Sequence, residues 1–242
     1  MRIRELHTLD LTAAEAVQLQ RQLAQKVILS PMRSTPRFAA GLDCAFSTDK
    51  KRIIATAVVL RWVARPNEAC RRRASLTVDV PEFEIVETAE AVLDVRFPYV
   101  PGLLSFREAP ACLEVMRKLR TIPDVVLADG QGIAHPRRLG LASHLGLFLD
   151  TPTIGCAKSR LIGKYGDVPM QKGASVPLLD KGEKIGFVVR TRTNVKPLFI
   201  SPGHKITHQQ AVEIVLNCCT RYRLPEPTRL AHQRVSQLKK QL

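Results

Sequence analysis

The chain has 242 residues, 45% of them hydrophobic, and its 37 basic residues exceed its 22 acidic residues to give a net charge of +15. This length and composition predict one sizeable core in a single α/β domain spanning residues 1–242. No apolar stretch approaches the length of a membrane span, so no membrane partner is expected. The basic excess predicts a polyanionic partner such as nucleic acid, with a merely soluble basic protein as the alternative.

Six cysteines lie mostly within apolar segments and form no Cys-x-x-Cys pair. They are typical of reduced core residues in a cytosolic protein. The segment from Met1 to Glu5 also lacks the apolar region of a secretory signal. We therefore expect a cytoplasmic protein.

The first expected element is a helix over about residues 12–29, because Thr12-Ala13-Ala14-Glu15 has the spacing of a capping box. Residues 38–46 and 52–63 are apolar strands joined by a short link, which predicts an antiparallel hairpin. Asp43 lies inside the first of these strands. A carboxylate in an apolar strand is costly unless it is paired or binds a cation.

A basic insertion follows at about residues 65–80, and we interpret it as a solvated charge run in preference to a specific nucleic-acid contact. Extended structure resumes at residues 82–95. A helix is then expected from Ser105 to about Leu119, beginning Ser105-Phe106-Arg107-Glu108. On spacing alone, Glu108 fits a structural role in a Ser-x-x-Glu capping box better than a catalytic one.

Residues 124–128 have the composition of a buried strand and end at Asp129, which is followed by Gly130-Gln131-Gly132. Residues 137–149 then predict an apolar helix and residues 153–157 a second strand, which ends at Lys158. Such crossover units gather functional groups at the carboxyl ends of their strands, so Asp129 and Lys158 should share one rim. An ordinary turn residue is the alternative for Asp129.

Late strands are expected at residues 184–192 and 197–200, followed by a helix that begins at Thr207. The tail after about residue 227 is basic, lacks a strong folding signal and is predicted to be disordered. The order of elements favours a mixed sheet flanked by helices. If its first strand lies beside the fourth, Asp43 and Asp129 are neighbours and a helix can present Glu108 to them. Clustered carboxylates of this kind suit Mg²⁺.

Several motifs resemble those of the endonuclease V family, the deoxyinosine 3′ endonucleases. They are the glycine turn at residues 129–137 (Asp-Gly-Gln-Gly-Ile-Ala-His-Pro-Arg), Pro98-Tyr99-Val100-Pro101-Gly102, residues 104–108 (Leu-Ser-Phe-Arg-Glu) and Gly203-His204-Lys205. The resemblance extends over nearly everything except residues near 65–80 and the last dozen. It implies a ribonuclease H-like fold and a Mg²⁺-dependent endonuclease, for which Mn²⁺ should substitute. Family members recognise deaminated bases, chiefly deoxyinosine, and hydrolyse the second phosphodiester bond 3′ to the lesion, leaving 3′-hydroxyl and 5′-phosphate ends.

The resemblance also implies roles for individual residues. Asp43, Glu108 and Asp129 would bind the metal, and Lys158 would approach the scissile phosphate, where a positive charge stabilises the transition state. His204 would act as a metal ligand or orient the attacking water. The remaining histidines carry no comparable indication: His7, His144, His208 and His232.

A second group of residues would contact DNA. The rigid loop Pro98, Tyr99, Val100 and Pro101 would act as a wedge that separates the strands beside the lesion. Gly130 and Gly132 would form the floor of a pocket for the damaged base, reached by backbone donors. The residues expected to hold the DNA itself are His135, Arg137 and Arg138. These two arginines fall in the first turn of a predicted helix, where a bound phosphate would relieve the conflict with the helix dipole.

The sequence leaves two further functions open. One is an inosine-directed ribonuclease, since some relatives act on RNA and nothing in the residues indicates whether a 2′-hydroxyl is contacted. The other is a non-catalytic nucleic-acid-binding module on the same fold, against which the retention of the acids, His204 and Lys158 argues. A nicotinamide enzyme is unsupported, because His135 stands where a dinucleotide fingerprint needs its third glycine. A monomer is expected.

Overall fold

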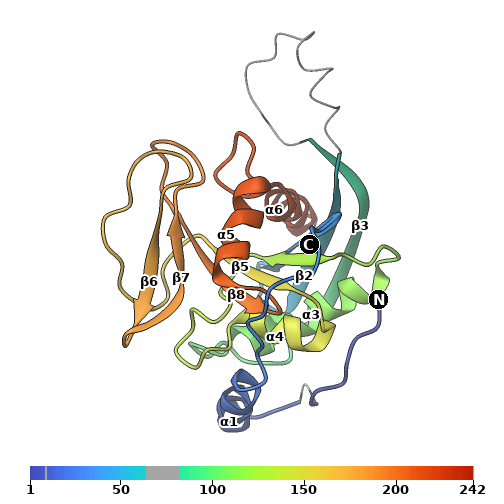
Figure 1. Ribbon diagram of the computed structural model, residues 1–242. Coiled ribbons are helices and arrows are strands. Elements are labelled where there is room, and N and C mark those ends of the chain that lie inside the picture. Colours follow the sequence, from blue (N-terminus) through green and yellow to red (C-terminus); the bar gives the residue numbers. More distant parts are fainter. Residues whose placement is uncertain (9, 64–81, 242) are drawn as a thin grey trace.

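A computed structural model describes residues 1–8, 10–63 and 82–241. A mixed eight-stranded sheet forms its centre, with helices on both faces (Figure 1). The strands are β1 (Phe38–Phe46), β2 (Arg52–Trp62), β3 (Phe83–Asp94), β4 (Val125–Ala128), β5 (Thr153–Ala157), β6 (Ser175–Asp180), β7 (Glu183–Val189) and β8 (Leu198–His204). The helices are α1 (Ala13–Ala24), α3 (Leu104–Lys118), α4 (Leu141–Leu149), α5 (His208–Asn217) and α6 (Glu226–Lys239).

The strand order is β3-β2-β1-β4-β5-β8-β7-β6. The first three strands form the expected antiparallel meander, and β1 pairs in parallel with β4, which pairs in parallel with β5. The predicted mixed sheet with its first strand beside the fourth is therefore confirmed. Strand β8 runs antiparallel to β5, so its last residue lies beside the first residue of β5.

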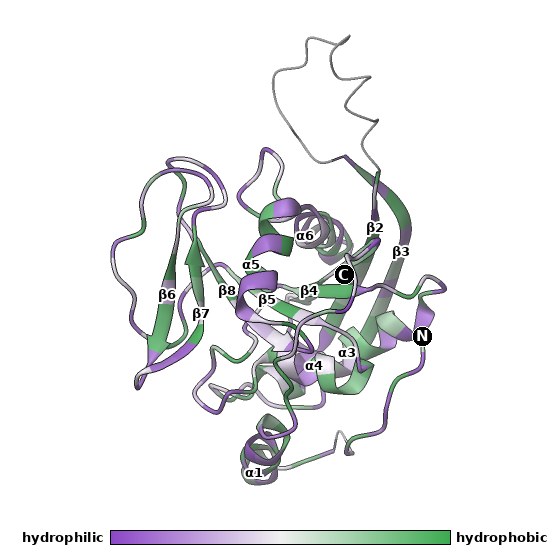
Figure 2. Cartoon of the chain, viewed as in Figure 1, coloured by the Kyte–Doolittle hydropathy of each residue, from purple (hydrophilic) through white to green (hydrophobic). Residues whose placement is uncertain are grey.

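Two layers of helices enclose the sheet (Figure 1). Successive residues of β1 alternate between them, as a strand requires. Ala40 and Leu42 pack in the cluster that contains residues of α3 and α4, whereas Ala39 packs with residues of α5 and Gly41 lies against α6. Figure 2 shows that β4 is hydrophobic and that α1, α5 and α6 combine hydrophobic with hydrophilic segments. Asp43 shares the face of Gly41 and is therefore directed toward α6.

Several element bounds differ from the sequence-based expectation. Helix α1 ends at Ala24, five residues before the predicted end, although its Thr12 capping box is present. Helix α4 begins at Leu141 instead of residue 137, because the segment before it is a turn in which Arg138 has a φ of 56°. Strand β6 was not predicted; it lies at the edge of the sheet, mostly exposed, and contains Pro177.

The prediction of a disordered tail after residue 227 is wrong. Helix α6 begins after Pro225 and packs on β1 and β2, with Ala231 and Val235 buried one turn apart. This buried stripe is narrow and the segment is otherwise mostly basic and polar, so the pattern did not predict a helix. The basic insertion expected at about residues 65–80 lies outside the described residues. Among the described residues, no helix combines the length and apolar character that crossing a bilayer requires.

Candidate metal centre

Two carboxylates meet where β1 and β4 run side by side. Leu42 is in register with Ala128, so the residues that follow, Asp43 and Asp129, are neighbours at the same end of the sheet. The backbone N–H of Asp129 donates to the carbonyl of Leu42 at 3.1 Å, which fixes this arrangement. Burial raises the pKa of Asp43, and the nearby charge of Asp129 raises it further. The two acids therefore repel each other unless a cation lies between them.

A histidine that the sequence did not single out completes this cluster. His232 lies on α6, and its Nδ1 is 2.6 Å from Oδ2 of Asp43. Ligand atoms of Asp43, Asp129 and His232 all lie within 4.8 Å of one another. The stripe of Ala231 and Val235 was the available sequence signal, since a helix with that buried face can direct His232 toward β1.

Glu108 is the third acid of the site. It lies in the second turn of α3 and is only 9% exposed. Its pKa is raised to about 8, first by burial and then by the charges of Asp43 and Asp129, although Arg107 opposes the shift. Glu108 is thus a buried acid within the electrostatic range of the other two.

The capping-box interpretation of Glu108 is wrong. Helix α3 begins at Leu104 after Leu103, which provides no side-chain cap, and Oγ of Ser105 has no hydrogen-bond partner among the described residues. A capping box needs its Ser one residue before the helix and its Glu at the third helical position. Glu108 lies too far into α3 for that role, so its burial has no capping explanation.

Lys158 follows β5 and supplies a positive charge beside the acids. Its Nζ forms an ion pair with Oδ2 of Asp129. The carbonyl of Lys158 accepts a hydrogen bond of 2.8 Å from Nη2 of Arg223, which also donates to the carbonyl of Pro197. The predicted common rim of Asp129 and Lys158 is present.

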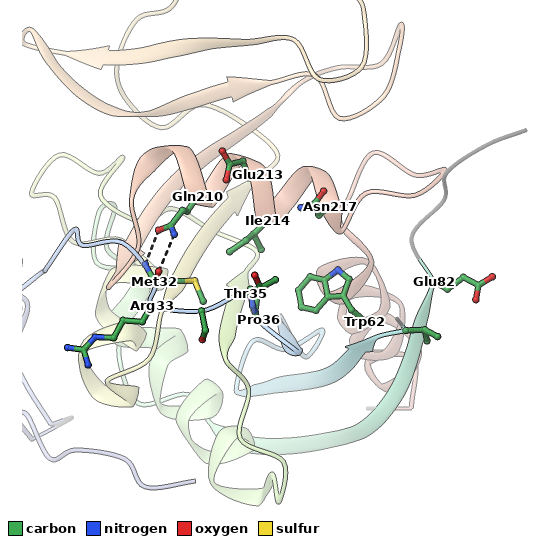
Figure 3. Close-up of a pocket in the computed structure, with 12 residues that line it drawn as sticks. Met32, Arg33, Thr35, Pro36, Trp62, Glu82, Gln210, Glu213, Ile214 and Asn217 are labelled. Atoms are coloured by element: carbon green, nitrogen blue, oxygen red, sulfur yellow. Dashed lines mark hydrogen bonds between the residues drawn. The ribbon is translucent and has the colours of Figure 1, made fainter. Parts of the chain in front are cut away.

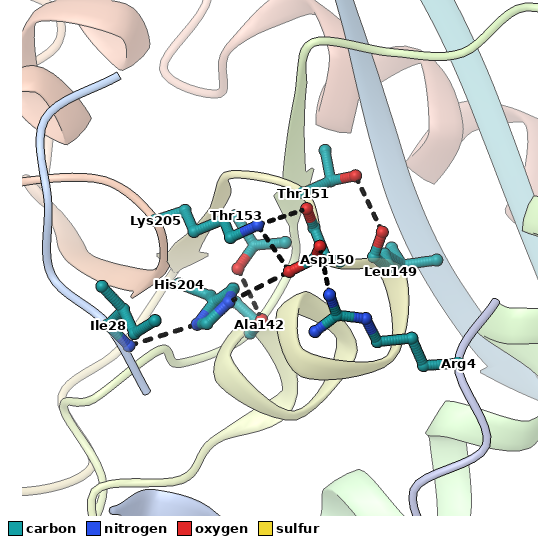
Figure 4. A network of polar contacts seen from close by, with 9 residues as sticks. All are labelled: Arg4, Ile28, Ala142, Leu149, Asp150, Thr151, Thr153, His204 and Lys205. Atoms are coloured by element: carbon teal, nitrogen blue, oxygen red, sulfur yellow. Dashed lines mark hydrogen bonds and ion pairs between the residues drawn. The ribbon is translucent and has the colours of Figure 1, made fainter. Parts of the chain in front are cut away.

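The structure does not bring His204 to the acids. His204 ends β8 beside Thr153, the first residue of β5, whereas Asp129 and Lys158 follow the carboxyl ends of β4 and β5. It is buried, and its Nδ1 accepts from the N–H of Ile28 at 3.2 Å, while its Nε2 is 3.9 Å from Oδ1 of Asp150 (Figure 4). Burial lowers the pKa of His204 to about 4, so the ring is neutral near pH 7. Its contacts are structural.

The side chains of His135 and Arg137 likewise form hydrogen bonds within the protein. His135 Nε2 is 3.0 Å from the carbonyl of Gly102, and Arg137 Nη2 donates to the same carbonyl at 2.8 Å. The N–H of Arg137 donates to His135 Nδ1, which places the remaining ring proton on Nε2, toward Gly102. Burial and the neighbouring Arg137 lower the pKa of His135 to about 4. These side chains fasten the end of the loop at residues 98–102 to the glycine turn.

Arg138 does not lie in a first helical turn, contrary to the prediction for it and Arg137. It forms ion pairs with Asp180 at 2.9 Å and Glu183 at 2.7 Å, both at the turn between β6 and β7. The supposed conflict with a helix dipole is therefore absent, because α4 begins only at Leu141. Arg138 has its charge neutralised by the protein.

Tyr99 of the wedge loop is exposed, whereas the two glycines expected to form a pocket floor use their N–H groups within the protein. Tyr99 is 71% exposed, so it is accessible to a ligand. The N–H of Gly130 donates to Ala128, and that of Gly132 donates to Oγ of Ser201. A Cβ on Gly132 would lie 2.1 Å from the carbonyl oxygen of Pro202. Close packing thus explains Gly132, and neither glycine offers the unused N–H that a pocket floor was expected to provide.

A large groove lies elsewhere. It has a volume of about 690 Å³ and is lined by Met32, Trp62, Gln210 and Ile214, among others (Figure 3). Trp62 ends β2 beside the start of β1, so this groove lies at the opposite end of the strands from Asp43. It contains no part of the acid cluster.

The acid cluster has the chemistry of a divalent-metal site. Asp43, Asp129 and Glu108 offer carboxylate oxygens, which Mg²⁺ prefers, and His232 offers an imidazole nitrogen of the kind that Mn²⁺ also accepts. Burial first, and then the neighbouring carboxylates, raise the pKa of Asp43 and Glu108, although Lys158 forms an ion pair with Asp129. A bound cation would stabilise all three acids in their ionised form.

Comparison with known proteins identifies the family. A family model for endonuclease V matches residues 63–233. The endonuclease V of Rippkaea orientalis is 45% identical over 236 residues, covering 98% of this chain and 95% of that protein. The crystal structure of endonuclease V from Streptomyces avermitilis has a TM-score of 0.84 at 35% identity, covering 100% of this chain and 99% of its own.

A third relative was solved with a nucleic acid. Ciona intestinalis endonuclease V, in complex with a 24mer DNA containing an inosine followed by a ribo-adenosine, has a TM-score of 0.76 at 27% identity and covers 94% of this chain and 98% of its own. The sheet and its flanking helices accordingly form the ribonuclease H-like fold of these structures. This chain belongs to the endonuclease V family of DNA-repair endonucleases.

Proposed function

We propose that this protein is a Mg²⁺-dependent endonuclease that recognises deaminated bases in DNA, chiefly deoxyinosine. It hydrolyses the second phosphodiester bond 3′ to the lesion and leaves 3′-hydroxyl and 5′-phosphate ends. The observation that carries the proposal is the convergence of Asp43, Asp129 and His232 within 4.8 Å, with the buried Glu108 beside them. The inosine-containing DNA bound by the Ciona relative supports the choice of substrate.

Asp43, Glu108 and Asp129 would hold the metal. A bound Mg²⁺ supplies a more acidic water and neutralises the charge that develops on the phosphate. Mn²⁺ should substitute, because the site offers the same oxygen ligands to either ion. The three carboxylates come from β1, α3 and the end of β4, so their spacing is set by the packing of α3 against the sheet.

His232 and Lys158 would act on the attacking water and the phosphate. The hydrogen bond from His232 Nδ1 to Asp43 leaves Nε2 available to orient a water and accept its proton. The ion pair with Asp129 holds the ammonium group of Lys158 at the same rim, where it can stabilise the negative phosphate in the transition state. His232 thus takes the role that the sequence suggested for His204.

Tyr99 would separate the strands beside the lesion. The side chain is exposed, and the hydrogen bonds that His135 and Arg137 make to Gly102 fix the end of its loop. An aromatic ring on a fixed loop can occupy the space left by an unstacked base. A deaminated base pairs weakly, so unstacking it costs less than unstacking a normal base, which contributes selectivity.

The test is incubation with an end-labelled duplex carrying one deoxyinosine, with and without Mg²⁺, followed by mapping of the nick. We expect one nick at the second bond 3′ to the lesion, only with the metal, and none in the undamaged duplex. Asp43→Ala should abolish the nick but retain binding. Tight lesion binding without nicking in Mg²⁺ or Mn²⁺ would favour a non-catalytic module, and faster cleavage of a single-stranded inosine RNA would favour a ribonuclease.

A further inference from the structure

A second groove lies beside the metal centre. It has a volume of about 430 Å³ and runs along one face of α3, opposite the first residues of β2 and the last residues of β3. Phe106, Arg107, Pro110, Glu114 and Arg117 form its helical side and recur at the spacing of one helix face. We call it the α3 groove. Because these residues run from Phe106 to Arg117, the α3 groove extends from the part of α3 that carries Glu108 to the far end of the helix.

The α3 groove is rich in arginine. It contains Arg52, Arg96, Arg107 and Arg117 against two acids, Asp94 and Glu114. Arg117 is paired with Glu114 at 3.2 Å. Within residues 1–8, 10–63 and 82–241, the other three arginines form no ion pair with a side chain. The end of the groove nearest the metal centre thus carries three guanidinium groups and one carboxylate.

Arg107 shows that this end lacks a partner. Its guanidinium lies over the ring of Phe46, 4.5 Å from the centroid, and is held there by a cation–π contact. Its Nε is buried and donates to no acceptor in the described part of the chain. A buried donor without an acceptor is costly. The side chain as a whole is only partly buried and forms no ion pair within the described residues, so the remainder of its guanidinium is available to an oxygen atom of a ligand.

The position of the groove connects two parts of the proposed site. Arg107 precedes Glu108 in α3, and Arg96 lies three residues before Tyr99. The arginines that the sequence suggested for DNA binding, Arg137 and Arg138, are occupied by Gly102, Asp180 and Glu183. Arg137 keeps its charge, because the carbonyl of Gly102 is neutral, and the α3 groove supplies three further arginines that pair with no acidic side chain of the described residues: Arg52, Arg96 and Arg107.

We propose that the α3 groove binds the sugar–phosphate backbone of the DNA arm that leaves the metal centre, an inference that rests on the proposed function. Phosphate oxygens would accept from Arg52, Arg96 and Arg107, and the apolar side chains between them would contact the sugars. Such contacts fix the register of the duplex on the protein without reading its sequence.

The test compares two double variants that remove equal charge. Arg52→Gln with Arg96→Gln removes two groove charges, and Arg33→Gln with Arg37→Gln removes two exposed charges that precede β1, at the opposite end of the strands from Asp43. Binding of undamaged and deoxyinosine duplexes is measured by fluorescence anisotropy in EDTA at several salt concentrations. We expect the groove variant to bind both duplexes at least tenfold more weakly and its salt slope to fall by about 1.8, because each phosphate contact contributes about 0.9.

The control variant should remain within threefold of the wild type in affinity. Affinity and salt slope of the groove variant equal to those of the wild type, or an equal loss in both double variants, would overturn the proposal. The single variant Arg96→Gln guards against misfolding, because Arg96 is exposed. It should show about half of the change in slope.

Trimming the duplex from either side of the lesion locates the contact. The wild type should lose affinity when the arm that fills the α3 groove is shortened, and the groove variant should lose none from the same trimming. If trimming the same arm lowers the affinity of the groove variant as much as that of the wild type, the assignment is wrong. The nicking assay separates the two proposals: a protein that nicks deoxyinosine DNA but shows no groove effect refutes only the groove, whereas a groove effect without nicking refutes only the proposed cleavage.

Discussion

Nδ1 of His232 lies 2.6 Å from Oδ2 of Asp43, although 189 positions separate the two residues in the chain. Asp43 is largely buried in β1, whereas the side chain of His232 is 46% exposed on α6. One partner is thus fixed in the sheet and the other can reach solvent. This is a suitable arrangement for a group that orients and deprotonates a water beside a metal.

His232→Ala should lower the single-turnover rate of deoxyinosine cleavage by about 10²-fold or more, the usual effect of losing a general base. Lesion binding in EDTA and the thermal midpoint should change little, because the side chain is half exposed. His204→Asn is the control. It retains an acceptor for the N–H of Ile28 and should cleave like the wild type. Equal losses of rate in both variants would show that His204 also contributes to cleavage.

Glu108→Gln should stabilise the metal-free protein at alkaline pH. The pKa of Glu108 in the folded protein is about 8, above its ordinary value of 4.5, so ionisation disfavours the folded state. The wild type should lose stability as the pH rises from about 4.5 through 8, and the variant should avoid a loss on the order of 3 kcal/mol between pH 6 and pH 9. Thermal unfolding in EDTA at pH 6 and pH 9 measures this difference.

The matched control for that experiment is Glu114→Gln. Glu114 lies on the same helix but pairs with Arg117 near the surface, so its neutralisation should leave the pH dependence unchanged. With Mg²⁺ added, the wild type should gain stability at pH 9 and Glu108→Gln should gain much less. Equal stabilisation of both proteins by Mg²⁺ would show that Glu108 is not a ligand.

The sequence predicted Asp43 and Asp129 as neighbours because both follow local rules. An acid inside an apolar strand is conspicuous, and an acid before a glycine turn marks the end of a parallel strand. His232 follows no local rule. Its place depends on α6 packing against β1, and the stripe that directs this packing consists mainly of Ala231 and Val235.

His204 illustrates the opposite error. Its motif, Gly203-His204-Lys205, matched the family pattern, and the sequence placed it in a loop after a strand that ends at residue 200. Strand β8 instead continues to His204 and runs antiparallel to β5. The direction of β8 carries the histidine to the far end of the sheet, and no local pattern specifies that direction.

Tyr99→Ala should reduce discrimination between deoxyinosine and undamaged duplexes by about tenfold, because an aromatic side chain contributes about 1–3 kcal/mol of stacking with a base. The variant should keep its fold, since Tyr99 is exposed. The ratio of the two dissociation constants in EDTA measures the effect. Tyr222→Ala, which removes another partly exposed tyrosine, should leave the ratio unchanged. A ratio unaffected by Tyr99→Ala would reject the wedge.

Gly41→Ala should impair cleavage without touching any proposed catalytic group. A Cβ at position 41 would lie 2.0 Å from the carbonyl carbon of Pro227 and 2.5 Å from the backbone nitrogen of Thr228, in the first turn of α6. The helix would have to move away from β1, at a cost of about 1–3 kcal/mol for overpacking. Since α6 carries His232, the contact with Asp43 should lengthen and the single-turnover rate should fall at least tenfold.

Gly166→Ala is the control for this change, because among the described residues no atom beyond its immediate chain neighbours lies within 4 Å of the added methyl group. It should retain both the rate and the free energy of unfolding. Rates are compared at a temperature where urea titration shows each variant to be more than 95% folded, so that a loss of rate in Gly41→Ala cannot come from unfolding. A destabilised Gly41→Ala protein that cleaves at the wild-type rate would mean that close packing of α6 on β1 is dispensable for placing His232.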